Sequence, residues 1–102
     1  MVTIYVDYPK DWKAEDGRIN TWCHLYTDPT DPKNIYALHR FARKIGLRSR
    51  WYQKHHPLPH YDLKPAQREK AIEAGAVEMS VLEFLRQTKL HKRLGRERPW
   101  LA

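Results

Sequence analysis

The stretch TWCHLYTDPTDPKNIYALHRFARKIG, which spans Thr21–Gly46, decides the fold class because it passes from a strand pattern through a turn into a helix pattern. Residues Thr21–Tyr26 are mostly aromatic, β-branched or apolar and predict a strand. Because side chains alternate between the two faces of a sheet, Cys23 and His24 should point in opposite directions. This argues against the two residues as joint ligands of one metal ion.

A helix is expected directly after the turn at residues 27–32. Asp31 suits the N-cap, Pro32 suits the first helical position and Gly46 suits the residue after the helix end. The apolar residues that would form its buried face recur at helical spacing and are Ile35, Leu38, Phe41, Ala42 and Ile45. The pattern therefore predicts a helix from Pro32 to about Ile45.

Further elements are predicted on both sides of this stretch. Strand patterns occupy residues 2–6, 47–53 and 76–79. Residues 8–20 are expected to form a loop, and two more helices should begin near Pro65 and after Ser80. This order contains two successive βαβ units. We therefore expect an α/β fold in a single domain at residues 1–85, with a small, mainly parallel sheet of about four strands and three helices.

The composition limits the compartment and the class of partner. A net charge of +7 and a pI near 9.7 favour anionic partners, namely nucleic acid, nucleotides or an acidic protein surface. The single cysteine, Cys23, cannot form an intramolecular disulfide, which is typical of a reducing compartment. No apolar run approaches the roughly 20 residues that span a bilayer. We therefore expect a cytoplasmic protein without a membrane partner.

Most of the positive charge is concentrated in residues 86–102, which we expect to form a basic helix end and tail. The basic residues of this segment are Arg86, Lys89, Lys92, Arg93, Arg96 and Arg98, against the single acid Glu97. Such a tail could contact a phosphate backbone or an acidic protein, and Trp100 could dock beside it. A solvated tail without a partner fits the same pattern.

Polar side chains at the ends of the predicted strands define a candidate site. In open α/β sheets, ligands bind beyond the carboxyl ends of the strands, which places residues 26–28 and 54–62 on the ligand side. The position of Asp7 depends on residues 8–20. If they cross the sheet, Asp7 joins the site; if Asp16-Gly17 forms a plain hairpin, Asp7 points to the other edge.

Histidine and carboxylate residues in this set suggest a divalent metal ion. Asp7, His24, His60 and Asp62 supply the ligand types of an open hydrolytic metal site. The sequence has no cysteine pair upstream of His56 and His60, which argues against a zinc finger. The alternative for His60 is a hydrogen bond to a backbone group, and for its neighbours His55 and His56 we favour a solvated loop.

Several other polar residues have structural alternatives. Asp62 could cap the helix that begins near Pro65 instead of serving a site. Arg68, early in that helix, could bind phosphate or be solvated. His39 is expected to be a partly buried, hydrogen-bonded residue, and Cys23 a small buried one.

An ordered series of short motifs resembles a known family. The first motifs along the chain are Tyr5-Val6-Asp7, Gly17-Arg18, Trp22 with His24-Leu25, and the run 38–42. They are followed by Trp51-Tyr52-Gln53, His60-Tyr61-Asp62, Arg68 and Gly75-Ala76. Over roughly residues 5–85 the chain resembles the bacterial and phage family catalogued as domain of unknown function 4031. The resemblance implies a compact cytoplasmic domain and no established activity.

Two functions follow as expectations. The first is binding of a phosphorylated ligand, nucleic acid or nucleotide, in its sharper form by a metal-dependent phosphodiester hydrolase. In that form the metal ligands are Asp7, His24 and Asp62, the proton-transferring residue is His60, and the phosphate-binding residues are Arg18 and Arg68. The second is a non-catalytic bacterial or phage accessory protein that binds nucleic acid or a host protein through the basic tail.

Overall fold

The computed structural model describes residues 2–89. The strands are β1 (Tyr5–Val6), β2 (Lys10–Lys13), β3 (Ile19–Tyr26), β4 (Tyr52–Gln53), β5 (His60–Leu63) and β6 (Val77–Glu78). The helices are α1 (Pro32–Lys44), α2 (Pro65–Glu73) and α3 (Val81–Thr88), with a 3₁₀ helix at Ser49–Trp51. The predicted basic tail beyond residue 89, with Trp100, lies outside the described residues.

The sheet is mixed and mostly antiparallel. Its strand order is β4-β5-β3-β1-β6, and β2 pairs with the first half of β3. Among the strands of residues 2–89, β1 and β6 form the one parallel pair. The α/β class and the three helices are confirmed, whereas the mainly parallel sheet of about four strands is wrong.

The prediction failed in the region of residues 47–63. In the expected strand at 47–53, Ser49–Trp51 forms a 3₁₀ helix and only Tyr52 and Gln53 pair as β4. The expected loop before α2 contains β5, which lies between β3 and β4. β3 and β4 both pair antiparallel with β5, so they run in the same direction but are separated by it, and the expected parallel pairing of neighbouring strands is lost.

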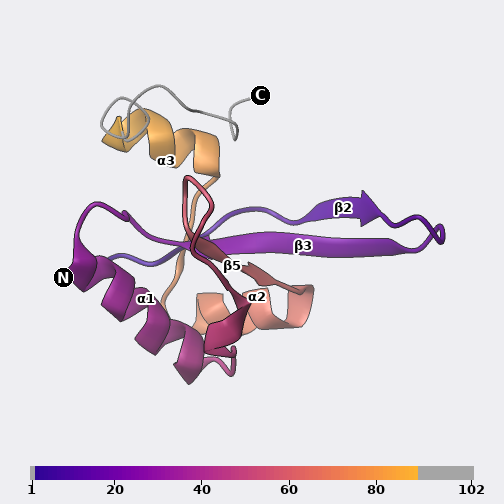
Figure 1. Ribbon diagram of the computed structural model, residues 1–102, viewed down its shortest axis with the longest axis horizontal. Coiled ribbons are helices and arrows are strands. Elements are labelled where there is room, and N and C mark those ends of the chain that lie inside the picture. Colours follow the sequence, from indigo (N-terminus) through magenta and orange to yellow (C-terminus); the bar gives the residue numbers. More distant parts are fainter. Residues whose placement is uncertain (1, 90–102) are drawn as a thin grey trace.

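The expected loop at residues 8–20 is also wrong, because most of it forms a hairpin with β3. Lys10–Lys13 pairs antiparallel with the start of β3, and Gly17 occupies the turn with a φ of +87°, in the left-handed region that favours glycine. The two strands form a long ribbon that projects from the body of the molecule (Figure 1).

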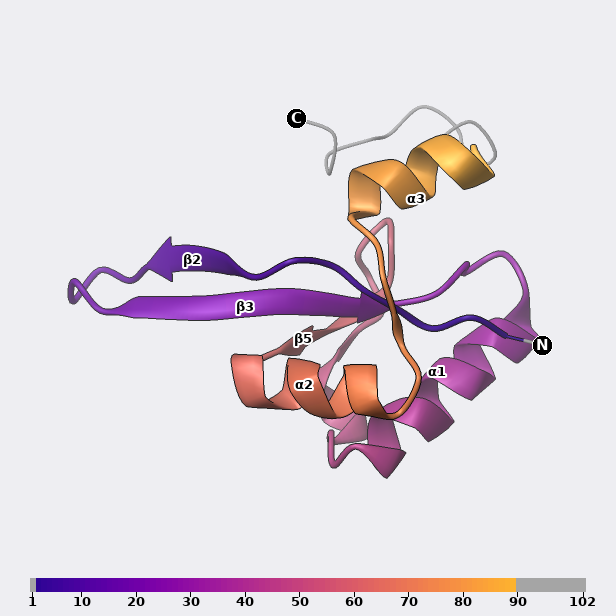
Figure 2. The same ribbon diagram turned by 180° about the vertical axis from the view of Figure 1, so that it is seen from behind.

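The helices lie on opposite faces of the sheet. α1 and α2 cover one face, and α3 packs on the other (Figures 1 and 2). The larger core, under α1 and α2, includes Val6, Leu25, Leu38, Leu63 and Ala71. A smaller core under α3 consists of Tyr26, Leu58, Phe84 and Leu85. Cys23 belongs to the first core, whereas His24 points to the α3 face, as the strand alternation predicts.

The helix boundaries follow their capping residues. The Asp31 side chain accepts the Lys33 N–H at the start of α1, and Gly46 has a φ of +89° after its end. Ser80 accepts the Glu83 N–H at the start of α3. Asp62 does not cap α2, because it lies within β5 and the residue before the helix is Lys64.

In the part of the chain that the structure describes, no helix is both long enough and apolar enough to cross a membrane.

Candidate metal centre

A one-residue bulge between β1 and β2 positions Asp7. Val6 is opposite Leu25 and Lys10 is opposite Trp22, so three residues of one strand face two residues of β3. Pro9 lies in this interval and cannot donate a ladder hydrogen bond. Bulges re-aim side chains, and this one directs Asp7 toward His24 although the hairpin itself continues.

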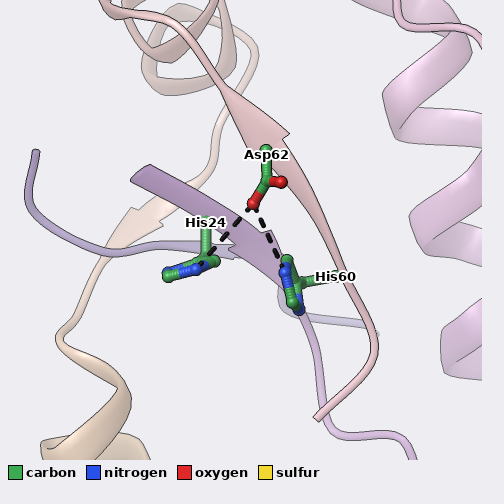
Figure 3. A group of neighbouring side chains, drawn as sticks. All are labelled: His24, His60 and Asp62. Carbon is green, nitrogen blue, oxygen red and sulfur yellow. Dashed lines mark ion pairs between the residues drawn. The ribbon is translucent and has the colours of Figure 1, made fainter. Parts of the chain in front are cut away.

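Three potential ligands come together on the α3 face of the sheet. His24 of β3 is directly opposite Asp62 of β5, and His60 is two residues before Asp62 on the same face. Their closest ligand atoms all lie within 4.8 Å of one another. Asp62 Oδ1 is 3.3 Å from His60 Nε2 and 3.9 Å from His24 Nε2 (Figure 3).

Asp7 orients His24 through contacts with its ring and its backbone. Asp7 Oδ2 lies 2.6 Å from His24 Nδ1, and Asp7 Oδ1 accepts the His24 backbone N–H. The Asp7 N–H donates in turn to the His24 carbonyl. Because a carboxylate beside Nδ1 accepts the proton of that nitrogen, it leaves the lone pair of His24 on Nε2, which is the atom near Asp62.

His60 is oriented in the same way by a backbone group. Its Nδ1 lies 2.9 Å from the carbonyl oxygen of Leu58, to which it donates, so that Nε2 again remains as the acceptor. The His60 side chain is only 9% exposed. The rings of His24 and His60 are nearly perpendicular, with centroids 4.6 Å apart. Both imidazoles therefore present the same nitrogen to one carboxylate oxygen.

Hydrogen bonds within the cluster shift the titration of two of its members. The hydrogen bond that His24 donates to Asp7 is the main reason that the pKa of His24 is raised, against the opposing effect of burial. The pKa of Asp62 is lowered mainly because the charged form of His60 can donate its Nε2–H to this carboxylate. Asp62 is therefore a carboxylate at neutral pH and His24 readily accepts a proton.

His56 is a fourth polar residue at this site. It lines two adjacent hollows of about 280 and 390 Å³, and both of these also contain His24 and His60. Its Nδ1 is 3.2 Å from both the N–H and the carbonyl oxygen of Leu58. The neutral ring can accept from the N–H and the charged ring can donate to the carbonyl, so either protonation state has a partner. Burial is the main cause that lowers the pKa of His56.

The two arginines of the expected phosphate site lie elsewhere. Arg18 is at the tip of the hairpin, with an 84% exposed side chain beside Asp16. Arg68 extends from α2, on the face opposite α3, and its Nε donates to the Asp7 carbonyl at 2.9 Å. Its Nη2 is 3.5 Å from Glu78 Oε2. Arg68 therefore supports the bulge and does not point toward the cluster of His24, His60 and Asp62.

Two residues have the structural surroundings that were expected of them. His39 is half-buried, and its Nδ1 lies 2.7 Å from the hydroxyl of Tyr61. Cys23 is 2% exposed, and burial raises the pKa of its thiol to about 12. A thiol with this pKa carries no thiolate at neutral pH and is a poor nucleophile.

Asp7, His24, His60 and Asp62 were grouped from the sequence, and the structure brings these four together. His56 was expected to be a solvated loop residue and is exposed in the turn, but it also lines the hollows at the cluster, which was not expected. The role of the Leu58 backbone has no signal in the sequence. The available signal for His56 was its spacing from the other histidine, His60, across a short turn stiffened by prolines.

Comparisons with known proteins give the family but no activity. A family model with the description "Protein of unknown function (DUF4031)" matches residues 4–91. No curated protein and no solved structure gives a significant match.

Proposed function

The chain belongs to the DUF4031 family, and we propose that it is a metal-dependent phosphodiester hydrolase that acts on a phosphorylated ligand, nucleic acid or nucleotide. One observation supports this proposal above all others. His24 and His60 both use Nδ1 for an anchoring hydrogen bond and both offer Nε2 beside Asp62 Oδ1. Carboxylate-anchored and carbonyl-anchored imidazoles are typical of metal ligands in proteins.

The spacing of the three atoms suits a transition-metal ion. Ligands bound at about 2.0–2.1 Å in tetrahedral geometry lie roughly 3.3 Å from one another. The observed separations of 3.3 and 3.9 Å to Asp62 need only small adjustments. Two imidazoles and one carboxylate leave at least one coordination position for water, as in hydrolytic zinc sites.

The geometry changes the roles that we assign to two residues. Asp7 is not a direct ligand in this proposal, because both of its oxygens already contact His24. It fixes the tautomer and orientation of that ring. His60 becomes a ligand, since its Nδ1 is bound to Leu58 and its Nε2 faces Asp62. Neither of its nitrogens remains for proton transfer while the metal is bound.

His56 is the residue that we propose for proton transfer. A metal ion held by these residues would bind a water molecule and lower its pKa to near 7. With its Nδ1–H donated to the Leu58 carbonyl, His56 would accept at Nε2 the proton of the attacking water as the water oxygen bonds to phosphorus. The bond from phosphorus to the leaving oxygen would break, and His56 would give its proton to that oxygen. The ring keeps its Leu58 partner in both charge states.

The position of Lys10 beside the cluster supports the proposal of a phosphorylated ligand. Lys10 lines the same hollow as Asp7, His24 and His56. Its ammonium group can neutralise a phosphate oxygen in the way that was expected of Arg18 and Arg68. The exposed indole of Trp12, in the same hollow, offers a flat surface for a base.

A metal titration of the full chain tests the proposal. Protein freed of metal by chelation is titrated with Zn²⁺, Mn²⁺, Co²⁺ and Ni²⁺ in a calorimeter, and the loaded forms are assayed on bis(p-nitrophenyl) phosphate. We expect one ion per chain, and we expect His60→Ala and Asp62→Asn to abolish both binding and hydrolysis. The matched control is His55→Ala, an exposed residue of the same turn, which should behave like the wild type.

Two results would contradict the proposal. One is a wild-type chain that binds none of the four ions. The other is metal binding that His60→Ala and Asp62→Asn leave unchanged. Metal binding without hydrolysis of any phosphodiester would retain the site but reject the reaction.

A further inference from the structure

Outside the metal centre, a strongly basic hollow lies between the end of α1 and the 3₁₀ helix. It has a volume of about 630 Å³, and Arg43, Arg48 and Arg50 line it. Its lining residues include Tyr36 and His39 but no aspartate or glutamate. Three guanidinium groups around an opening without a carboxylate form a site for anions.

The local sequence explains this concentration of arginines. Arg43 lies in the last turn of α1, where cations stabilise the carboxyl end of the helix dipole. Gly46 then reverses the chain, and Arg48 and Arg50 come before and within the 3₁₀ helix that follows. The reversal brings the two segments together at one opening. All three arginines are exposed and can reach a ligand.

A second hollow, of about 430 Å³, lies beside this pocket. It shares Arg50 with the arginine pocket and is also lined by Trp22, Trp51, Gln53 and Lys64. Trp51 is 39% exposed, and the ammonium group of Lys64 lies 5.7 Å from the centre of the Trp22 ring. Aromatic faces and cations therefore alternate along this segment.

The second hollow continues into the metal centre. Trp22, Gln53 and Asp62 line both this hollow and the one of about 390 Å³ that contains His24 and His60. Shared lining residues thus link the three hollows in series. The arginine pocket opens on the α1 side, where Tyr61 lines it, and the metal centre lies on the α3 face, so the track passes around the β4 edge of the sheet.

The geometry points to a binding track for single-stranded nucleic acid, with the arginine pocket as a phosphate site and Trp51 and Trp22 as stacking surfaces for bases. This inference rests on the proposed function, since the track ends at the proposed metal. Alternating cations and aromatic faces are typical of proteins that bind single strands. A duplex keeps its base faces stacked inside, and an acidic peptide has no bases to stack on the tryptophans.

Fluorescence anisotropy of the metal-free full chain tests the track without cleavage of the ligand. The probes are a labelled 12-nucleotide oligothymidylate and the corresponding oligouridylate, which distinguish DNA from RNA. We expect Trp51→Ala to weaken binding roughly 10-fold, and Trp51→Phe to restore most of it. Arg48→Ala with Arg50→Ala should weaken binding at least 10-fold and reduce the salt slope by roughly 1.4.

The control separates the track from the rest of the basic surface. Arg18→Ala removes an exposed arginine at the hairpin tip, far from the track, and should leave the affinity unchanged within about 2-fold. His60→Ala should lose metal but keep oligonucleotide binding, so failure of the metal site and failure of the track give different results. Circular dichroism of each variant confirms that the fold is retained.

Three outcomes would overturn the inference. The first is equal affinity of the wild type and of the Trp51 and arginine variants, which would place binding elsewhere on the chain. The second is equal or tighter binding of a 12-base-pair duplex. The third is full competition by polyglutamate at matched charge, which would indicate an acidic protein partner instead.

Discussion

At the scale of single residues, Asp7 and Leu58 each fix the orientation of one histidine, but with different chemical groups. A carboxylate holds Nδ1 of His24, and a backbone carbonyl holds Nδ1 of His60. The charged partner strengthens the basicity of its imidazole, and the neutral one contributes less. His24 should therefore be the stronger of the two metal ligands, and its affinity should depend on Asp7.

Asp7→Asn is expected to weaken metal binding 10- to 100-fold, because the amide no longer carries the charge that holds the His24 proton on Nδ1. Affinity is measured by competition with a chromophoric chelator. Asp16→Asn, at the exposed hairpin tip, is the control and should not change it. An Asp7→Asn chain that binds metal as tightly as the wild type would exclude the orienting role.

The raised pKa of His24 predicts that two contributions to the stability of the fold change with pH in opposite directions, one made by His24 in the metal-free chain and one made by the bound metal. Without metal, protonated His24 paired with Asp7 stabilises the fold, so this contribution is complete below a pH of about 6.5 and is lost as the pH rises through the raised pKa. With metal, the ring must be neutral, so the metal's contribution is lost as the pH falls through the same pKa.

Urea denaturation between pH 6 and pH 8 measures this difference. The additional free energy of unfolding that saturating Zn²⁺ provides should increase with pH across this interval. A metal contribution that stays constant or decreases would contradict the assignment of His24 as a ligand. Asp7→Asn should move the increase to lower pH, because it removes the main cause of the raised pKa.

At the scale of secondary-structure elements, the bulge between β1 and β2 depends on α2. Arg68 crosses from the helix to donate to the Asp7 carbonyl, and its guanidinium lies 5.6 Å from the centre of the Tyr8 ring. This contact comes from the face opposite the metal cluster, and it fixes the segment that orients Asp7. The orientation of Asp7 thus depends on elements from both faces of the sheet.

Arg68→Ala should lower the free energy of unfolding by about 1.5–3 kcal/mol, because it leaves the half-buried Asp7 carbonyl without its charged donor. Chemical denaturation measures the change. Lys70→Ala, two residues along the same helix and exposed, is the control and should stay within about 0.5 kcal/mol. Equal stabilities of the two variants would show that the contact does not hold the bulge.

The helices could be predicted from the sequence, because their signals are local. Asp31, Gly46 and Ser80 act on residues within one turn, and each takes the predicted capping position. Strand pairing is not local. The four residues of β5 follow two prolines and carry the alternation of buried Tyr61 and Leu63 with His60 and Asp62, but nothing nearby in sequence specifies β3 as their partner.

The residues of the candidate site lie together, but not in the arrangement that was expected. His24, His60 and Asp62 were expected at the carboxyl edge of a parallel sheet, and they lie on the face of an antiparallel one. The residue types indicated the chemistry, and the pairing of β3 with β5 supplies the proximity. Arg18 failed as a candidate because the hairpin carries it away from the body (Figure 1).

At the scale of the whole molecule, the small core under α3 links that helix to the metal centre. Leu58, which anchors His60 through its carbonyl, is buried with Phe84 and Tyr26. The Phe84 ring lies 5.1 Å from the rings of both Tyr5 and Tyr26. Packing of α3 therefore determines how well the turn at residues 54–59 is fixed.

Phe84→Ala should reduce the free energy of unfolding by about 3–5 kcal/mol, because it leaves a cavity in this small core. It should also weaken metal binding, because Leu58, which anchors His60, packs in the same core. Leu82→Ala, at a 47% exposed position of the same helix, is the control for both measurements. A Phe84→Ala chain with unchanged metal affinity would show that α3 and the site are independent.

The parallel pairing of β1 with β6 has a consequence for synthesis on the ribosome. Tyr5 pairs with Val77 and Val6 with Glu78, so one edge of β1 has no partner until nearly the whole described chain has been made. Exposed strand edges are sites of aggregation. The edge of β1 that faces β6 therefore stays unpaired while residues 7–76, which include α1 and α2, are synthesised, and the sheet closes only after β6 has been made.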